Sequence, residues 1–190
     1  MHAVRTAQIC ILDGVGIVLA ARYHNIPLGE RITGVDLMSD LITQAGNMRL
    51  RVLLIGGRPN LALSLSKCYQ DKYSEAKFFG TMGFKDIQHP TKTEEAEILA
   101  IVRRNKPHMI LAAFGSPWQE LWLARHSKEF KGIVCMGVGQ GFDVAGGLVK
   151  RAPVLIQNIG LEWLYRLIAQ PWRWRRQLRL FKFMWLIITS

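Results

Sequence analysis

Continuous apolar runs alternate with segments of helical period along this chain. Three runs are predicted to form clear strands, namely Leu50–Ile55, Met109–Phe114 and Gly132–Met136. The first of them has the continuous apolar content of a strand buried on both faces of a sheet. Two weaker apolar runs, Gln8–Leu12 and Ala76–Phe79, are also expected to form strands. Helices are predicted at Ile17–Tyr23, at Val35–Ala45, after Asn60 to about Tyr73, from Thr91 to about Asn105, and after Pro117. Thr91 and Glu94 have the spacing of a capping box at the start of their helix.

The regular alternation of strands and helices predicts the fold class. Strands separated by helices favour a mostly parallel sheet that helices cover on both faces. The 190 residues suffice for one domain with a substantial core. We therefore predict a Rossmann-like α/β domain over residues 1–165, followed by a basic, amphipathic tail over residues 166–190.

Composition excludes several classes of protein. The three cysteines, Cys10, Cys68 and Cys135, are widely spaced and form neither a disulfide framework nor a metal-binding pair, which fits a reducing cytoplasm. The chain has no zinc-protease motif and no P-loop. The first ten residues do not resemble a signal peptide. We therefore expect no metal and no cofactor.

Glycines follow several of the predicted strands. They include Gly56-Gly57, the loop from Gly80 to Gly83, Gly115, and the loop from Gly137 to Pro153, which contains five glycines. Glycine lets the backbone approach a ligand closely, and ligands of open α/β sheets bind outside the carboxyl ends of the strands. Each glycine taken alone is equally consistent with a tight turn, but their recurrence favours a ligand-binding edge.

Polar candidates stand in the same loops. Ser116, Pro117 and Gln119 have the spacing of an N-cap, a first helical residue and a capping box, so Gln119 either caps the helix or binds a ligand. Asp13 and Asp143 follow predicted strands and either stabilise turns or serve as a general base.

The C-terminal segment is basic and rich in large apolar side chains. No acidic residue occurs from Trp163 to Ser190, and this segment contains Arg166, Arg173, Arg175 and Arg176. Its final apolar run is too short to cross a bilayer. Basic and aromatic residues on a short helix are typical of a segment that lies in the membrane interface. We favour a membrane surface over nucleic acid as its partner, because the apolar residues are large and numerous.

Six motifs together resemble a known family. They are Asp13-Gly-x-Gly; Glu30-Arg31-x-x-Gly34-x-Asp36-Leu37; Gly56-Gly57; Gly115-x-Pro117-x-Gln119-Glu120; Gly137-Val138-Gly139-x-x-Phe142-Asp143 leading to Arg151-Ala152-Pro153; and Leu161-Glu162-Trp163-Leu164-Tyr165-Arg166-Leu167. In this order the motifs resemble the WecG/TagA/CpsF family of bacterial glycosyltransferases. These enzymes move an N-acetylmannosamine-type sugar from a UDP donor to a lipid-linked sugar.

The resemblance implies a role for each matched position. Asp13 falls on the proposed catalytic base, and Gln119 on a glutamine implicated in substrate binding. The other implied substrate-binding residues are Gly56, Gly57, Gly115, Glu120, Gly137, Gly139, Phe142, Asp143 and Arg151. The basic tail resembles the membrane-targeting appendage of the family, and its arginines would also neutralise the leaving UDP. The implied reaction is a metal-independent sugar transfer that inverts the anomeric configuration, carried out by a peripheral protein at the cytoplasmic face of the bacterial plasma membrane. The sequence leaves open whether the chain forms a homo-oligomer.

One departure from the family concerns the N-terminal side. Family members usually carry several dozen residues before the Asp-Gly-x-Gly motif, whereas twelve residues precede Asp13 here. The sequence therefore leaves open a catalytically incomplete, membrane-associated module that binds a UDP-sugar without transferring it. A nicotinamide-dependent oxidoreductase would share the layout, but the G-x-G-x-x-G fingerprint is absent.

Overall fold

A computed structural model describes residues 5–29, 31–169, 171, 174, 178, 183 and 185–187, and for Asn158 it describes the backbone alone. The chain divides into two compact units. The first unit contains residues 1–10 and 34–149, and the second contains residues 11–33 and 150–190. The predicted domain boundary at residue 165 is a functional one, with the catalytic part before it and the membrane-associating tail after it. This boundary stays a prediction.

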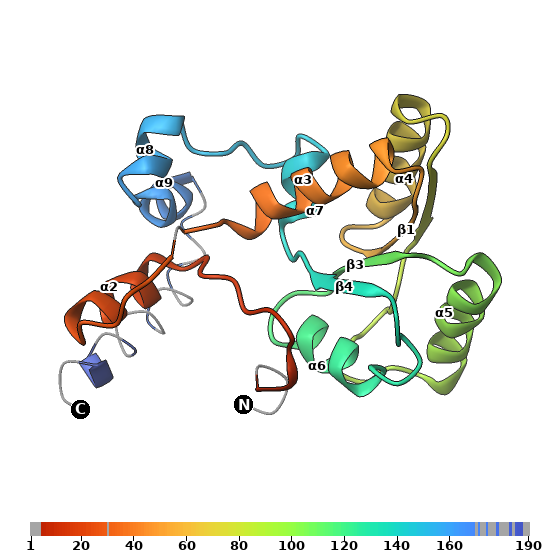
Figure 1. The fold of residues 1–190 in the computed structure, drawn as a ribbon, viewed down its shortest axis with the longest axis horizontal. Helices are drawn as coiled ribbons and strands as arrows, with labels where there is room; N and C mark the ends of the chain where they lie inside the picture. Colours follow the sequence, from red (N-terminus) through yellow and green to blue (C-terminus); the bar gives the residue numbers. More distant parts are fainter. Residues whose placement is uncertain are drawn as a thin grey trace. The chain divides into compact units, whose positions relative to one another are not determined.

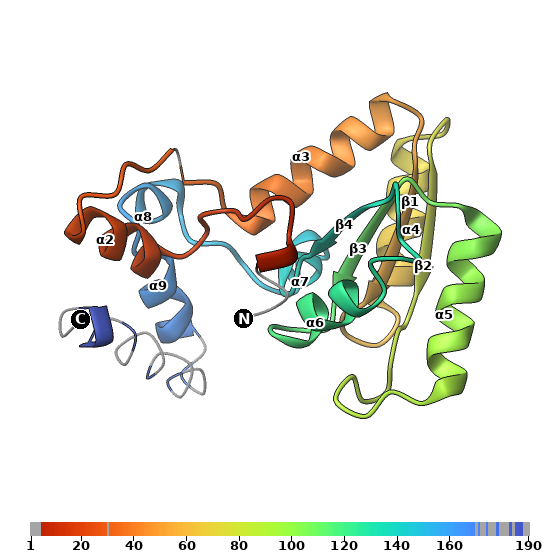
Figure 2. The ribbon, with the colours of Figure 1, turned by 60° about the horizontal axis from the view of Figure 1, so that its bottom comes forward.

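A four-stranded parallel sheet forms the centre of the first unit. Its strands are β1 (Arg51–Gly56), β2 (Lys77–Thr81), β3 (Met109–Ala113) and β4 (Val134–Gly137). They lie in the order β2-β1-β3-β4, which Figure 2 shows from one side of the sheet. The register pairs Val52 with Phe78 on one side and with Met109 on the other. Since all pairs are parallel, the carboxyl ends of the strands lie at one edge.

Helices cover both faces of this sheet, as the alternation predicts. One face packs against α3 (Gly34–Asn47), α4 (Leu61–Lys72) and α7 (Gly141–Ala145). The other face packs against α5 (Lys92–Asn105) and α6 (Trp118–Arg125) (Figure 1). Successive residues of β1 face opposite layers: Val52 and Leu54 lie in the first core, and Leu53 and Ile55 in the second. The predicted α/β class with a parallel sheet covered on both faces is confirmed.

The capping box predicted for α5 is also present. The Thr91 hydroxyl accepts a hydrogen bond from the Glu94 backbone amide at 3.2 Å, and the Glu94 carboxylate accepts one from the Thr91 amide at 2.9 Å. Two amides at the helix start are thereby satisfied.

The strand predicted at Gln8–Leu12 is wrong. None of residues 8–12 belongs to a strand, and Ile9 is 81% exposed. An apolar run becomes a strand only where a neighbour supplies hydrogen bonds and a layer covers its face. The sheet edges here are instead formed by β2 and β4. Asp13 therefore does not follow a strand.

The second unit is helical in its described part. It contains α2 (Val15–Tyr23), α8 (Val154–Asn158) and α9 (Glu162–Ala169). Gly160 has a positive φ of 78°, and a Cβ there would lie 3.3 Å from a Val15 methyl group. The turn between α8 and α9 therefore packs closely on the start of α2.

Candidate functional site

Three glycine-bearing loops lie together at the carboxyl edge of the sheet. Gly56 ends β1 and Gly57 follows it, Gly115 follows β3, and Gly137 ends β4. Gly56, Gly57 and Gly115 all have φ near +80°, which is a backbone conformation that side chains disfavour. The backbone amide of Gly57 donates to the Ala113 carbonyl at 2.8 Å, so the first loop is fastened to the end of β3. The structure therefore brings the predicted glycines to one edge.

Gln119 connects two of these loops from a buried position. Its side-chain oxygen accepts hydrogen bonds from the amides of Gly115 and Gly139, each at 3.1 Å. Its amide nitrogen donates to the Glu120 carboxylate at 2.8 Å, and only 4% of the residue is exposed. A Cβ on Gly137 would approach that nitrogen to 2.7 Å. Gln119 therefore braces the loops after β3 and β4.

The helix that follows Gly115 starts differently from the prediction. Ser116 was expected as the N-cap, but α6 begins at Trp118 with Pro117 in the cap position and without a side-chain cap. The predicted role of Ser116 is therefore wrong. Gln119 satisfies a backbone amide of the turn, as a capping box would, but that amide belongs to Gly115. The buried Gln119 side chain also accepts a hydrogen bond from the Gly139 amide, which lies in the loop after β4.

The buried Phe142 side chain packs against the glycine turn after β1. The side chain is 1% exposed and belongs to the core between the sheet, α3 and α4. A Cβ on Gly57 would lie 3.2 Å from the Phe142 ring, so the glycine turn rests directly on this ring. The side chain of Phe142 is thus occupied by packing, and its backbone belongs to α7, the short helix that follows β4.

Asp143 is paired with Arg58, an arginine that is not among the predicted site residues. Its Oδ1 atom lies 2.6 Å from Nε of Arg58, which follows Gly57. The Asp143 side chain is 15% exposed, whereas that of Arg58 is 59% exposed. The pair joins the loop after β1 to α7. Sequence could not reveal it, because 85 positions separate the two residues.

An open pocket of about 220 Å³ lies beside the first glycine loop. Its walls come from the end of β1, the end of β3 and the loop after β2, and they comprise Gly56, Gly57, Met82, Phe84, Lys85, Asp86, Ile87, Ala113 and Phe114. Phe84 and Phe114 pack edge to face with ring centroids 5.2 Å apart. The residues from the loop after β2 were not predicted. Of the glycines at positions 80 and 83, the first belongs to β2 and the second, with a φ of 80°, lies in that loop and is its sequence signal.

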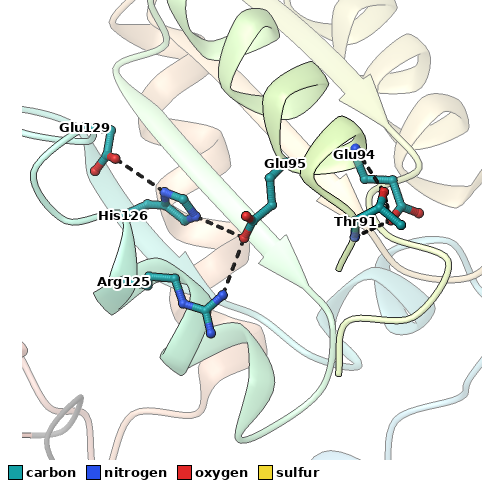
Figure 3. Close-up of polar contacts among 6 residues, drawn as sticks. All are labelled: Thr91, Glu94, Glu95, Arg125, His126 and Glu129. Carbon is teal, nitrogen blue, oxygen red and sulfur yellow. Dashed lines mark hydrogen bonds and ion pairs between the residues drawn. The ribbon is translucent and has the colours of Figure 1, made fainter. Parts of the chain in front are cut away.

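Glu94 holds this wall of the pocket. The Lys85 amide donates to Glu94 Oε1 at 3.0 Å, and Thr91 binds the other carboxylate oxygen (Figure 3). These hydrogen bonds, with that from Lys85 the largest cause, lower the pKa of Glu94 to about 2. In the same loop, hydrogen bonds from His89 and from the Gln88 amide hold the pKa of Asp86 below its ordinary value.

A second polar cluster links α5 to α6. His126 is 7% exposed and lies between two carboxylates, with Nε2 3.4 Å from Glu95 and Nδ1 3.6 Å from Glu129 (Figure 3). Arg125 also reaches Glu95, at 3.5 Å. The His126 ring packs on Trp122 with centroids 5.1 Å apart. This cluster contains no predicted site residue, and its contacts explain it as a link between two helices on one face of the sheet.

Asp13 belongs to the second unit and is exposed. Its backbone carbonyl accepts a hydrogen bond from Nε of Arg31 at 2.9 Å, and Arg31 also donates to the Gln157 carbonyl at 3.3 Å. Arg31 therefore fixes the backbone of the Asp13 segment against α8 and leaves the Asp13 carboxylate exposed. Arg151, in the same unit, lies 3.5 Å from the Thr33 hydroxyl.

Of the arginines assigned to the leaving group or to the membrane, the structure describes Arg166. It pairs with Glu162 one helical turn earlier in α9, and Glu162 is 6% exposed. Arg173, Arg175 and Arg176 lie outside the described residues. Within the described part of the chain, no helix combines the length and apolarity that crossing a membrane requires. Among the same residues, no group of three or more histidine, cysteine, aspartate or glutamate side chains is arranged to hold a metal ion.

Comparison with known proteins gives a family match over the whole chain. The model described as "Glycosyl transferase WecG/TagA/CpsF family" matches residues 1–190. A Bacillus subtilis (strain 168) protein named N-acetylglucosaminyldiphosphoundecaprenol N-acetyl-beta-D-mannosaminyltransferase is 33% identical over 178 residues, which cover 94% of this chain and 67% of that protein. A Staphylococcus aureus (strain MRSA252) protein of the same name is 29% identical over 176 residues, covering 93% and 66%. The chain spans about two thirds of the length of these relatives.

Proposed function

Because the chain belongs to the WecG/TagA/CpsF family of glycosyl transferases, we propose that it transfers an N-acetylmannosamine-type sugar from a UDP donor. The acceptor is a polyprenyl-diphosphate-linked N-acetylhexosamine, and the product serves bacterial cell-surface polysaccharide or teichoic acid synthesis. The family match over residues 1–190 carries this proposal. The names of the relatives support it, since they specify a mannosaminyl group and an N-acetylglucosaminyl-diphosphoundecaprenol acceptor.

The carboxyl edge of the sheet supports donor binding in the first unit. Glycines with positive φ at positions 56, 57 and 115 let a ligand approach the backbone closely. Gln119 fixes the loops after β3 and β4 relative to each other, which pre-orders the edge before a ligand arrives. The UDP group binds along these loops, with Glu120, Gly137 and Gly139 among the residues nearest to it.

In the proposed reaction Asp13 is the general base. It accepts the proton of the acceptor hydroxyl while that oxygen forms a bond to the anomeric carbon of the donor sugar. The bond from the anomeric carbon to the β-phosphate oxygen breaks in the same step, the electron pair leaves with UDP, and the configuration inverts. Positive side chains stabilise the departing diphosphate, which is the task a metal ion performs in other transferases. The exposed carboxylate of Asp13 and the Arg31 contact to its backbone support this role.

The lipid-linked acceptor places the reaction at a membrane surface. We propose that the basic tail, with Arg166, Arg173, Arg175 and Arg176, associates peripherally with the cytoplasmic face of the plasma membrane. Anionic lipids attract clustered cations, and aromatic side chains favour the headgroup region. The sequence of the tail supports this, since residues 163–190 contain no acidic side chain.

Glycosyl transfer itself is the first experiment. The protein is incubated with UDP-N-acetylhexosamines and a short-chain lipid-diphosphate-N-acetylglucosamine, and the glycosylated lipid is followed by mass spectrometry. We expect transfer from UDP-N-acetylmannosamine or its uronate. UDP binding without transfer from any donor would instead support the catalytically incomplete module.

Asp13→Asn tests the base. The amide cannot take the proton, so we expect kcat to fall by roughly 10²- to 10⁴-fold with little change in UDP affinity. Asp40→Asn, at an exposed position of α3, is the matched control and should keep the wild-type rate. An Asp13→Asn protein that is folded and transfers at the normal rate contradicts the mechanism.

A further inference from the structure

We propose that Arg58 orients the diphosphate of the nucleotide donor, and that Asp143 acts by positioning the Arg58 guanidinium. The inference rests on the proposed function, because it assumes a nucleoside diphosphate at the carboxyl edge of the sheet. It adds a cation within the first unit to the tail arginines expected to neutralise the leaving group. It also changes the role of Asp143 from a direct substrate contact to a residue that acts through another.

The position of Arg58 is set by the glycine turn at the end of β1. Gly56 and Gly57 have φ of 86° and 82°, and α4 starts at Leu61, three residues after Arg58. The backbone of Asn60, just before α4, is left-handed, and the helix has no side-chain cap. Arg58 therefore leaves the sheet at the edge where ligands of parallel α/β sheets bind.

The ion pair holds one edge of the guanidinium and leaves the other available. Nε of Arg58 lies 2.6 Å from Oδ1 of Asp143. Within the part of the chain that the structure describes, the two terminal nitrogens of Arg58 have no hydrogen-bond partner. A planar guanidinium with free terminal N–H groups matches two phosphate oxygens, and prior anchoring reduces the side-chain entropy lost when they bind.

Exposure of the two partners is unequal. The carboxylate is the inner partner at 15% exposed, and the guanidinium is the outer one at 59%. The first unit contains a contrasting pair: Nε of Arg49 lies 2.9 Å from Glu75, but both of these side chains are more than 60% exposed. That pair has the character of an ordinary surface contact. In the Arg58 pair, the Asp143 carboxylate is largely shielded from solvent, and the Arg58 guanidinium that it holds is mostly exposed.

The charge of Asp143 gives the proposal a sharp test. A carboxylate beside a diphosphate repels it, so removing the charge alone would strengthen nucleotide binding. If Asp143 acts by holding Arg58, removing it frees the guanidinium and weakens binding instead. The two roles thus predict opposite signs for Asp143→Asn.

The experiment measures dissociation constants of UDP, uridine and inorganic pyrophosphate by calorimetry. For Arg58→Gln we expect UDP and pyrophosphate to bind roughly 10- to 100-fold more weakly, as a lost hydrogen bond to a charged group implies, with uridine unchanged. Arg58→Lys should restore part of the loss, because it keeps the charge without the planar fork. Arg49→Gln removes an arginine with the same Nε-to-carboxylate contact, and it should leave all three constants unchanged.

Asp143→Asn is then measured in both backgrounds. With Arg58 present we expect UDP to bind several-fold more weakly, and with Arg58→Gln already in place we expect no further weakening. Thermal unfolding of each variant checks that the fold is kept. Tighter binding of UDP by Asp143→Asn, or an equal loss in both backgrounds, overturns the positioning role of Asp143.

The outcomes separate this inference from the proposed function. Wild-type protein that binds UDP and transfers sugar, together with an Arg58→Gln variant of unchanged UDP affinity, refutes the role of Arg58 and leaves the transferase intact. Wild-type protein that binds neither UDP nor pyrophosphate refutes the premise of a nucleoside diphosphate site itself.

Discussion

A single buried amide, that of Gln119, connects two loops of the candidate site. Its oxygen accepts from Gly115 and Gly139, and its nitrogen donates to Glu120. Family resemblance implies that this glutamine binds substrate, and that role stays a prediction. The contacts show that both lone pairs of its oxygen already serve the protein. Any contribution to substrate binding through that oxygen is therefore made by ordering the loops.

Gln119→Leu removes this brace at nearly constant side-chain volume. Two backbone amides lose their acceptor in a partly buried setting, so we expect the free energy of unfolding to fall by about 2 kcal/mol. The midpoint of urea unfolding at an unchanged m-value measures the loss. A leucine variant as stable as the wild type would show that the two hydrogen bonds contribute nothing net.

At the scale of elements, Glu94 ties α5 to the loop that forms one wall of the pocket. The carboxylate binds the Thr91 amide and hydroxyl and the Lys85 amide, and these bonds require its charged form. Its pKa is about 2, below the ordinary 4.5. Because the folded pKa is the lower one, the stabilisation is complete above the ordinary value and is lost as pH falls towards the folded value.

We therefore expect urea midpoints of the wild type to fall between pH 4.5 and pH 2 partly through Glu94. Glu94→Gln should lower the midpoint at pH 6 and flatten its dependence on pH in that window. Glu97→Gln, at an exposed position of the same helix, is the control and should keep the wild-type slope. Identical slopes in all three proteins would mean that the Glu94 contacts do not contribute to stability.

Elements were predictable where local signals agreed. The apolar runs before Gly56 and Gly115 form β1 and β3, and the Thr91 to Glu94 spacing forms a true capping box. The run at Gln8–Leu12 failed because strand formation depends on a partner that an isolated pattern does not reveal. Arg58 was missed for a related reason, since its partner Asp143 is distant in sequence. Local chemistry could locate the glycine loops, but it could not show what joins them.

At the scale of the whole molecule, formal charge is unevenly distributed. The net charge is +11, and residues 163–190 contain cations without any compensating acidic residue. A membrane that carries anionic lipid would attract this purely cationic segment far more strongly than it would attract a protein surface with charges of both signs. The first unit carries its cations differently, for example in the exposed last turn of α5.

Replacing Arg173, Arg175 and Arg176 together by Gln tests membrane association of the tail. At about 1 kcal/mol per cation, binding to vesicles containing anionic phosphatidylserine should weaken by roughly 100-fold. Co-sedimentation with these vesicles and with neutral ones measures it. The matched control replaces three exposed cations of the first unit, Arg103, Arg104 and Lys106, by Gln. Equal losses in both triple variants would assign the effect to net charge and not to the tail.

The amide brace also bears on how substrate preference can diverge among related proteins. Because the oxygen of Gln119 accepts hydrogen bonds from amides in the loops after β3 and β4, the sequences of the two loops have to be compatible with each other. A chimera that took the segment from Gly115 to position 119 from a relative with a different residue at that position would lack the acceptor for the Gly139 amide. A chimera that took the segment after β4 from a relative with a larger residue at position 137 would bring a Cβ against the side-chain nitrogen of Gln119. New specificities at this edge are therefore expected to arise by paired exchange of both loops, and seldom by changes in one alone.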